Sequence, residues 1–322
     1  MERGKKSAFG RWAIRAGGSA LALVLIFSLL PREAIFEGFR RLTWPLFLSV
    51  FASFLVCHVV AAAKWWWLMD RAIGFPAALR AHFGGLAANL CLPGAAGGDA
   101  VRAGLAHVAL RDGPRVAAAA VGDRIIDLVA LVCLMLVGLA FIGGAGSGGL
   151  AAVVAGGVLA AASAGLFLLP GVVRVLWSRW PELPARDLAL RSADAFAALA
   201  RRPGLLLAAL AVSVAIQSVL IWLSIRLALA VGVEVPVAAW FFAWPLAKII
   251  ATLPISLGGL GVRESSLAAL LAPFGAAAAE VVASGLAWQG ILYLAGALGA
   301  LVLALSGGSF RTRPSAIKEI SE

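Results

Sequence analysis

Long apolar runs constrain this chain of 322 residues more than any other feature of its sequence. Runs of this kind are typical of helices that cross the hydrocarbon core of a membrane. No water reaches the backbone in hydrocarbon, so every N–H and C=O group must be paired within the chain, which favours helices. We therefore expect one integral membrane domain, an all-α polytopic helix bundle with six full spans. The predicted spans cover about residues 16–30, 44–63, 116–142, 150–169, 204–231 and 281–305.

The composition supports this expectation and excludes several other classes of protein. Hydrophobic residues make up 62% of the chain and charged residues 13%, whereas an ordinary soluble domain is about 25% charged. A water-soluble globule, a disordered tail and a nucleic-acid-binding module are all excluded. The formal net charge of +11 comes from short basic segments between the apolar runs, which is the distribution that sets membrane topology.

The basic residues predict the orientation. With the N-terminus in the cytoplasm, 20 of the 27 Lys and Arg residues fall on the inside, 3 outside and 4 within membrane segments. Both termini are therefore expected to be cytoplasmic. The first run could instead be a cleaved signal peptide, but Pro31-Arg32 follows it directly and offers no small-residue cleavage site. The segment Lys64-Trp65-Trp66-Trp67 resembles an interfacial anchor at the end of the second span.

Two apolar segments, about residues 77–110 and 237–273, are interrupted and do not fit simple crossings. Each is long enough for two short helices, and irregular backbone at membrane depth needs protein or a wet cavity around it. We predict two re-entrant helical hairpins, although two kinked ordinary helices would also explain the pattern. The predicted breaks are Pro93, Gly97, Gly98, Pro254, Gly258 and Gly259.

The two interrupted segments share a motif. Residues 92–102 and 253–263 both read L-P-x-x-x-G-G-x-x-V-R, and the arginines that end them are 161 residues apart. Two predicted spans precede the first segment and five precede the second, so the two segments enter from opposite sides. Paired, interrupted segments in opposite orientation are typical of inverted-repeat transporters with a midplane site.

Each interruption is expected to aim a helix N-terminus into the protein, with Asp99 as the N-cap of the first helix. An arginine, Arg102 or Arg263, would then stand in the first turn, and such a pairing suits a phosphate group. Snorkelling of both arginines to the membrane surface is the alternative.

Eight charges fall at probable membrane depth, four acidic and four basic. Each would cost roughly 2.5–3.5 kcal/mol unpaired at a helix centre, so they should face each other or a wet cavity. A purely structural ion network is an open alternative to a binding site. Asp123 and Asp127 also match a D-x-x-x-D pattern that can hold Mg²⁺ and a diphosphate, although no second acidic cluster accompanies it. The eight are Asp99, Arg102, Asp123, Arg124, Asp127, Lys248, Arg263 and Glu264.

Two weaker features complete the sequence. Residues 185–202 carry Leu188, Phe196 and Leu199 at helical spacing, which predicts a helix on the cytoplasmic membrane face or a solvated connector. His58 stands alone in an apolar run and is interpreted as structural.

Three motifs together resemble the flippase-like, lysylphosphatidylglycerol synthase transmembrane family. They are N-x-x-x-P-G-x-x-G-G-D-x-x-R at residues 89–102, Asp123-Arg124, and P-I-S-x-G-G-L-G-x-R-E at residues 254–264. The resemblance implies a polytopic bacterial or archaeal membrane protein linked to moving lipids between leaflets, and we expect it in a bacterial cytoplasmic (inner) membrane. It does not imply synthase activity, because only residues 306–322 follow the last span. By position it implicates Asn89, Asp99, Arg102, Asp123, Arg124, Arg263 and Glu264.

The sequence thus predicts translocation of an anionic or polyprenyl-type lipid without an ATPase, a cofactor, a metal or a catalytic site in this chain. Asn89, Arg102, Lys248 and Arg263 are the expected headgroup contacts, and the acidic residues would hold these bases or carry coupling protons. A non-transporting partner of a lipid- or glycan-synthesis enzyme is the alternative, followed by an Mg²⁺-dependent intramembrane enzyme. Membrane lipids, and such synthesis enzymes, are the expected partners, and nucleic acid is not.

Overall fold

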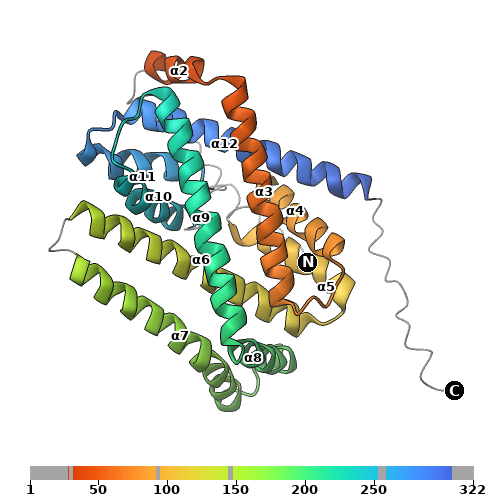
Figure 1. Cartoon of the computed structure of the whole chain (residues 1–322). Helices are drawn as coiled ribbons and strands as arrows, with labels where there is room; N and C mark the ends of the chain where they lie inside the picture. The colour runs from red at the N-terminus through yellow and green to blue at the C-terminus, as the bar shows by residue number, and fades with distance from the viewer. Residues whose placement is uncertain (1–27, 29–31, 92–94, 144–147, 253–258, 307–322) are drawn as a thin grey trace.

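The computed structural model describes residues 28, 32–91, 95–143, 148–252 and 259–306, and these residues form an all-helical bundle (Figure 1). The helices of the first half are α2 (Arg32–Arg41), α3 (Trp44–Leu68), α4 (Phe75–Cys91), α5 (Ala95–Leu110) and α6 (Gly113–Ile142). Those that follow are α7 (Gly148–Arg179), α8 (Arg186–Ala200), α9 (Pro203–Val231), α10 (Val237–Ala251), α11 (Val262–Leu271), the 3-10 helix η1 (Ala272–Phe274) and α12 (Ala278–Leu305).

Four helices in the described part of the chain are long and apolar enough to cross a membrane, namely α3, α6, α9 and α12. They coincide with four of the six predicted spans and make this a multi-pass membrane protein. The 32-residue helix α7 covers the predicted span at 150–169, and the predicted span at 16–30 lies outside the described residues. The all-α class is therefore confirmed, whereas the number of six spans is not.

The helices α3 and α9 lie side by side in opposite directions. Arg41, just before α3, donates to the carbonyl oxygen of Val231 at the end of α9 at 3.4 Å. At the other end, Arg202 before α9 pairs with Asp70 after α3 at 2.9 Å. The helix that precedes one interrupted segment is therefore antiparallel to the helix that precedes the other, as an inverted repeat requires.

The repeat extends over most of the chain. Shifted by 161 residues, the bounds of α3, α4 and α6 become 205–229, 236–252 and 274–303, within four residues of α9, α10 and α12. Each half packs its short helices against the long helix of the other half. Helix α4 packs along α12 and α10 packs along α6, so each interrupted segment lies against the long helix of the other half. Helix α7 stands outside this correspondence.

Two glycines make this packing between the halves possible. A Cβ on Gly138 of α6 would lie 2.4 Å from the backbone nitrogen of Phe242, and a Cβ on Gly299 of α12 would lie 2.2 Å from the carbonyl oxygen of Phe83. Gly138 and Gly299 are also 161 residues apart, so the same close crossing occurs in both halves. Small residues at such crossings let membrane helices approach closely.

Both interrupted segments form pairs of short helices. At 1.5 Å per residue, α4, α5, α10 and α11 are about 25, 24, 22 and 15 Å long, shorter than the ~30 Å hydrocarbon core. The first expected helix start was wrong, because α5 begins at Ala95 and includes Gly97, Gly98 and Asp99. Gly98 does not interrupt the chain but lets α5 pack closely against α4, because a Cβ at this position would come within 2.5 Å of the Gly85 carbonyl oxygen. Asp99 is accordingly no N-cap.

The second pair agrees better with its predicted interruption. Helix α11 begins at Val262 after Gly261, whose φ of 81° suits glycine, so Arg263 does stand in the first turn. Gly259 also has a positive φ, of 79°. The other predicted breaks, Pro93, Pro254 and Gly258, lie outside the described residues.

The predicted interfacial helix exists as α8, but its apolar stripe packs against protein. Phe196 and Leu199 are buried, and α8 contacts α6 and α7. Only Leu188 of the three stripe residues is exposed. Helix α2, which the sequence analysis did not expect, packs on α12 as α8 packs on α6, in keeping with the repeat.

We predict that Gly299→Ala destabilises the protein, because the new methyl group meets backbone atoms that cannot move independently. Overpacking of this kind costs about 1–3 kcal/mol, and Gly138→Ala should behave in the same way. Thermal unfolding in detergent measures the effect. Gly104→Ala is the matched control, since a Cβ there meets nothing within 4 Å. Equal melting temperatures for all three variants would contradict the close-crossing argument.

Candidate functional site

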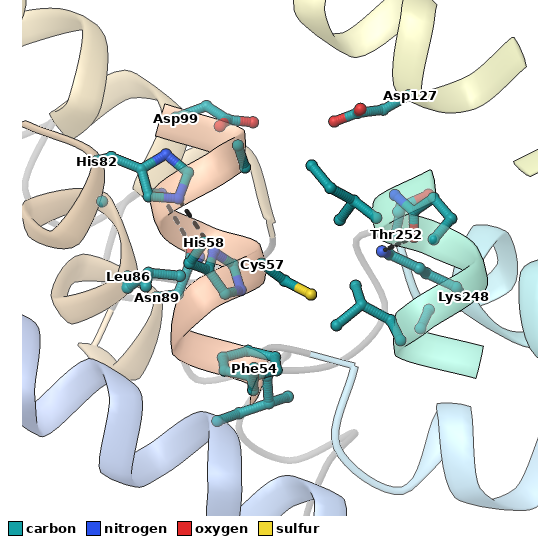
Figure 2. A pocket seen from close by; sticks show the side chains of 18 of the residues that line it. Phe54, Cys57, His58, His82, Leu86, Asn89, Asp99, Asp127, Lys248 and Thr252 are labelled. Atoms are coloured by element: carbon teal, nitrogen blue, oxygen red, sulfur yellow. Dashed lines mark hydrogen bonds between the residues drawn. The ribbon is translucent and has the colours of Figure 1, made fainter. Parts of the chain in front are cut away.

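The two short-helix pairs and the long helices enclose a cavity of ≈ 300 Å³ (Figure 2). Its wall draws on α3, α4, α5, α6, α9, α10, α11 and α12, so both halves of the repeat contribute. Seven of the eight charges predicted at membrane depth line the cavity, and the eighth, Glu264, pairs with a lining residue. The charged and polar lining residues are Lys64, Asn89, Asp99, Arg102, Asp123, Arg124, Asp127, Gln217, Lys248, Thr252, Arg263, Gln289 and Tyr293, with His58 and His82.

A balanced ion network holds α3, α5 and α6 together on one wall. Lys64 Nζ lies 2.9 Å from Asp123 Oδ1 and 2.5 Å from Asp127 Oδ1. Ser213 of α9 accepts from Lys64 at 2.6 Å and donates to Asp127 at 2.8 Å. The Lys64 ammonium therefore lies between the two carboxylates of the D-x-x-x-D pattern, in the place that a divalent cation would take.

The arginines complete this network. Arg102 lies 3.0 Å from Asp123 and 3.4 Å from Asp99, and its guanidinium stacks over the Trp65 ring at 4.5 Å. Arg124 pairs with Asp99 at 2.7 Å. Three cations and three carboxylates thus neutralise one another. Arg102 is almost completely buried, so its charge is largely committed to these partners.

The prediction that Lys64 belongs to an interfacial anchor at the membrane surface was wrong. The tryptophans beside it resemble a membrane-surface belt, but α3 continues to Leu68, and Lys64 and Trp65 are 2% and 0% exposed. The sequence signal that could have identified Lys64 is its spacing from the end of the apolar run, together with the need of Asp123 and Asp127 for a cation.

A second, smaller cluster lies at the start of α11. Arg263 pairs with Glu264 and donates to Gln289 at 3.1 Å. Glu264, which is fully buried, also accepts from the backbone N–H of Gly261 at 2.7 Å. The carboxylate therefore caps α11 and orients Arg263 toward the cavity.

Lys248 on α10 differs from the other cations of the cavity. Its ammonium donates to Gln217 at 2.9 Å and lies 4.9 Å from the Trp244 ring. Among the described residues no carboxylate oxygen comes within 4.0 Å of it. Figure 2 shows Lys248 across the cavity from Asp99, His58 and His82. It gives the cavity a positive charge that no carboxylate in the described part of the chain neutralises by direct contact.

Asn89 has a structural contact as well as a place in the cavity wall. Its side-chain oxygen accepts from the backbone N–H of Gly98 at 3.1 Å. This bond satisfies one free N–H of the first turn of α5 and joins the two arms of the first helix pair.

The sequence shows His58 as a lone histidine in an apolar run, but in the structure it has a partner. Its Nδ1 lies 3.0 Å from Nε2 of His82 on α4, within hydrogen-bonding distance, and both rings line the cavity (Figure 2). His82 was missed because nothing in a single sequence indicates that positions 58 and 82 meet. Among the described residues no group of three or more His, Cys, Asp or Glu side chains could hold a metal ion.

This arrangement of paired short helices around a charged cavity defines a class, the multi-pass membrane proteins built on an internal repeat. Residues 12–299 match the family model described as the lysylphosphatidylglycerol synthase TM region. The chain therefore belongs to this family, which links it to lipid handling, and the resemblance of the three motifs is confirmed. A search of curated proteins and of solved structures finds no match.

We predict that Lys64→Met destabilises the protein strongly, by about 3–5 kcal/mol, because it strands two carboxylates in the membrane domain. The double variant Lys64→Met with Asp127→Asn should recover much of this loss, since Arg102 still neutralises Asp123. Unfolding in detergent gives both values. Arg174→Met is the control, because its pair with Asp194 is more than half exposed and should contribute at most about 1 kcal/mol. A double variant as unstable as the single one would argue against charge balance.

Proposed function

We propose that this protein moves a lipid with an anionic or polyprenyl-phosphate-type headgroup between the two leaflets of a bacterial inner membrane. It does so without chemistry on the lipid and without ATP hydrolysis by this chain. The observation that carries the proposal is the ammonium of Lys248, which has no carboxylate partner among the described residues and lies in a cavity shared by both halves of the repeat.

The charges of the cavity support an anionic ligand. The network around Lys64 sums to zero, as does the pair Arg263–Glu264, so Lys248 leaves the cavity with one excess positive charge. Arg263, at the N-terminus of α11, lines the same cavity. A cation and a helix N-terminus together favour a phosphate group. Arg102 is better suited to holding the network in place, because Asp123 and Asp99 already neutralise it.

The repeat supports movement between leaflets. The antiparallel halves place each short-helix pair against the long helix of the other half, and such halves can open the cavity to one side and then to the other. In this proposal the two pairs are re-entrant hairpins, the first entering from the cytoplasm and the second from outside, with both termini cytoplasmic.

The first test of the proposal is transport. In liposomes that contain a trace of fluorescent phosphatidylglycerol, Lys248→Gln and Arg263→Gln should slow transfer between leaflets by about 10- to 100-fold, the value of one charge-assisted contact. Lys248→Arg should retain part of the rate, because it keeps the charge. The leaflet distribution is read by quenching the outer leaflet.

Arg226→Gln is the matched control, since Arg226 is exposed on α9 and is not part of the cavity wall. Its transfer rate should equal that of the wild type. If well-folded wild-type protein transfers no lipid, the chain is a non-transporting partner of a synthesis enzyme instead, and the proposal is wrong.

A second test addresses the orientation. In a background without the three native cysteines, single cysteines at Gly74 and Arg115, which flank the first pair, should react with an impermeant thiol reagent only from the cytoplasm. Cysteines at Glu234 and Ala277, which flank the second pair, should react only from outside. All four of these positions are exposed, so a cysteine placed there is accessible to the reagent. Labelling of one pair's two flanks from opposite sides would mean that this pair crosses the membrane.

A further inference from the structure

The histidine pair in the cavity is not used by the proposed function. His58 on α3 and His82 on α4 are the two histidines of the cavity, and their Nδ1 and Nε2 atoms lie 3.0 Å apart. His82 is only 8% exposed. Its other nitrogen, Nδ1, is buried and has no hydrogen-bond partner in the described part of the chain.

The geometry leaves the pair one open position for a proton. A neutral imidazole has one N–H and one bare nitrogen. If His82 donates to His58, then His82 Nδ1 is a bare nitrogen. If His58 donates instead, then His58 Nε2 is bare and His82 holds an unbonded N–H. In both tautomers one nitrogen can accept a proton without breaking the bond between the rings.

Charged side chains from five helices line the cavity around the histidine pair. They are Lys64 on α3, Asp99 and Arg102 on α5, Asp123, Arg124 and Asp127 on α6, Lys248 on α10 and Arg263 on α11. Together with Glu264 they comprise five cations and four carboxylates. The single excess charge is that of Lys248, which lies across the cavity from His58 (Figure 2).

We propose that His58 and His82 form the proton-binding site of the cavity, and that this proton moves together with the anionic headgroup. The inference rests on the proposed function and names its coupling ion. An anion beside Lys248 offsets the excess positive charge of the cavity and so favours a proton on the pair. By reciprocity, the proton strengthens binding of the anion by the same factor.

The charge balance explains why the two ligands belong together. The empty cavity has a net charge of one positive unit, and a singly charged headgroup cancels it. One added proton restores it. The empty protein and the doubly loaded protein therefore carry the same charge, so the movement of one anion together with one proton across the membrane is electroneutral and independent of the membrane potential.

Proton uptake on lipid binding tests the site directly. Phosphatidylglycerol added to purified protein in weakly buffered detergent should cause uptake of one proton for each lipid bound, reported by a soluble pH indicator. Phosphatidylcholine, which has no net charge, should cause none. His58→Gln and His82→Gln should still bind the lipid, about tenfold or more weakly because the coupled proton is lost, and take up no proton.

His107→Gln is the matched control. His107 is the third histidine of the chain, is exposed on α5 and lies outside the cavity wall, so this variant should behave as the wild type. In liposomes, a gradient of one pH unit should shift the leaflet ratio of the lipid about tenfold in the wild type and in His107→Gln. The shift should vanish in the two cavity variants, which should still equilibrate the lipid.

The outcomes separate this inference from the proposed function. Lipid binding and transfer without proton uptake by the wild type would overturn the inference and leave the proposed function standing. No lipid binding and no transfer would overturn both. Uptake that persists in both cavity variants, or disappears in His107→Gln, would assign the proton to another group. The wild-type measurement needs no substitution, so an unfolded variant cannot hide the result.

Discussion

The structure depends on one electrostatic constraint, namely that a charge inside a membrane domain must be paired. Lys64 lies between Asp123 and Asp127, and Arg102 joins Asp123 to Asp99. These contacts connect α3, α5 and α6, and Ser213 adds α9. Breaking one of them strands a buried charge, which costs more than the pair contributes. The network therefore acts as the rigid wall against which the rest of the cavity is built.

The two halves have a similar helix arrangement, but equivalent positions do not carry the same charged residues. Arg102 and Arg263 occupy equivalent positions, yet the position equivalent to Asp123 in the second half is Ser284. Arg263 consequently takes its carboxylate from the adjacent Glu264 and its second contact from Gln289. Lys248 on α10 has Ala87 as its equivalent on α4. The repeat thus supplies two walls of similar shape, and one of them carries the free positive charge.

The sequence predicted a large part of the site because its signals are local or compositional. The two interrupted segments, their shared motif and the eight charges are all visible in order along the chain, and the cost of burying charge requires those residues to meet. The sequence predictions were wrong for residues whose role depends on a contact with a residue distant in the sequence. Gly98 looked like a break but is a contact point with α4, and Lys64 looked like a surface anchor but neutralises two carboxylates. His58 acquired a partner that is 24 residues away.

By itself the sequence determined that the chain is an all-helical membrane protein with an internal repeat, because hydrocarbon admits only backbones that satisfy their own hydrogen bonds. It also determined which charges must be buried. Only the tertiary structure decided how they pair, because several pairings satisfy the same charge balance and helix packing selects one of them. The close crossings at Gly138 and Gly299 set that packing. Among the described residues the folded chain leaves Lys248 without a carboxylate partner and brings His58 to His82, and neither result can be deduced from charge counting.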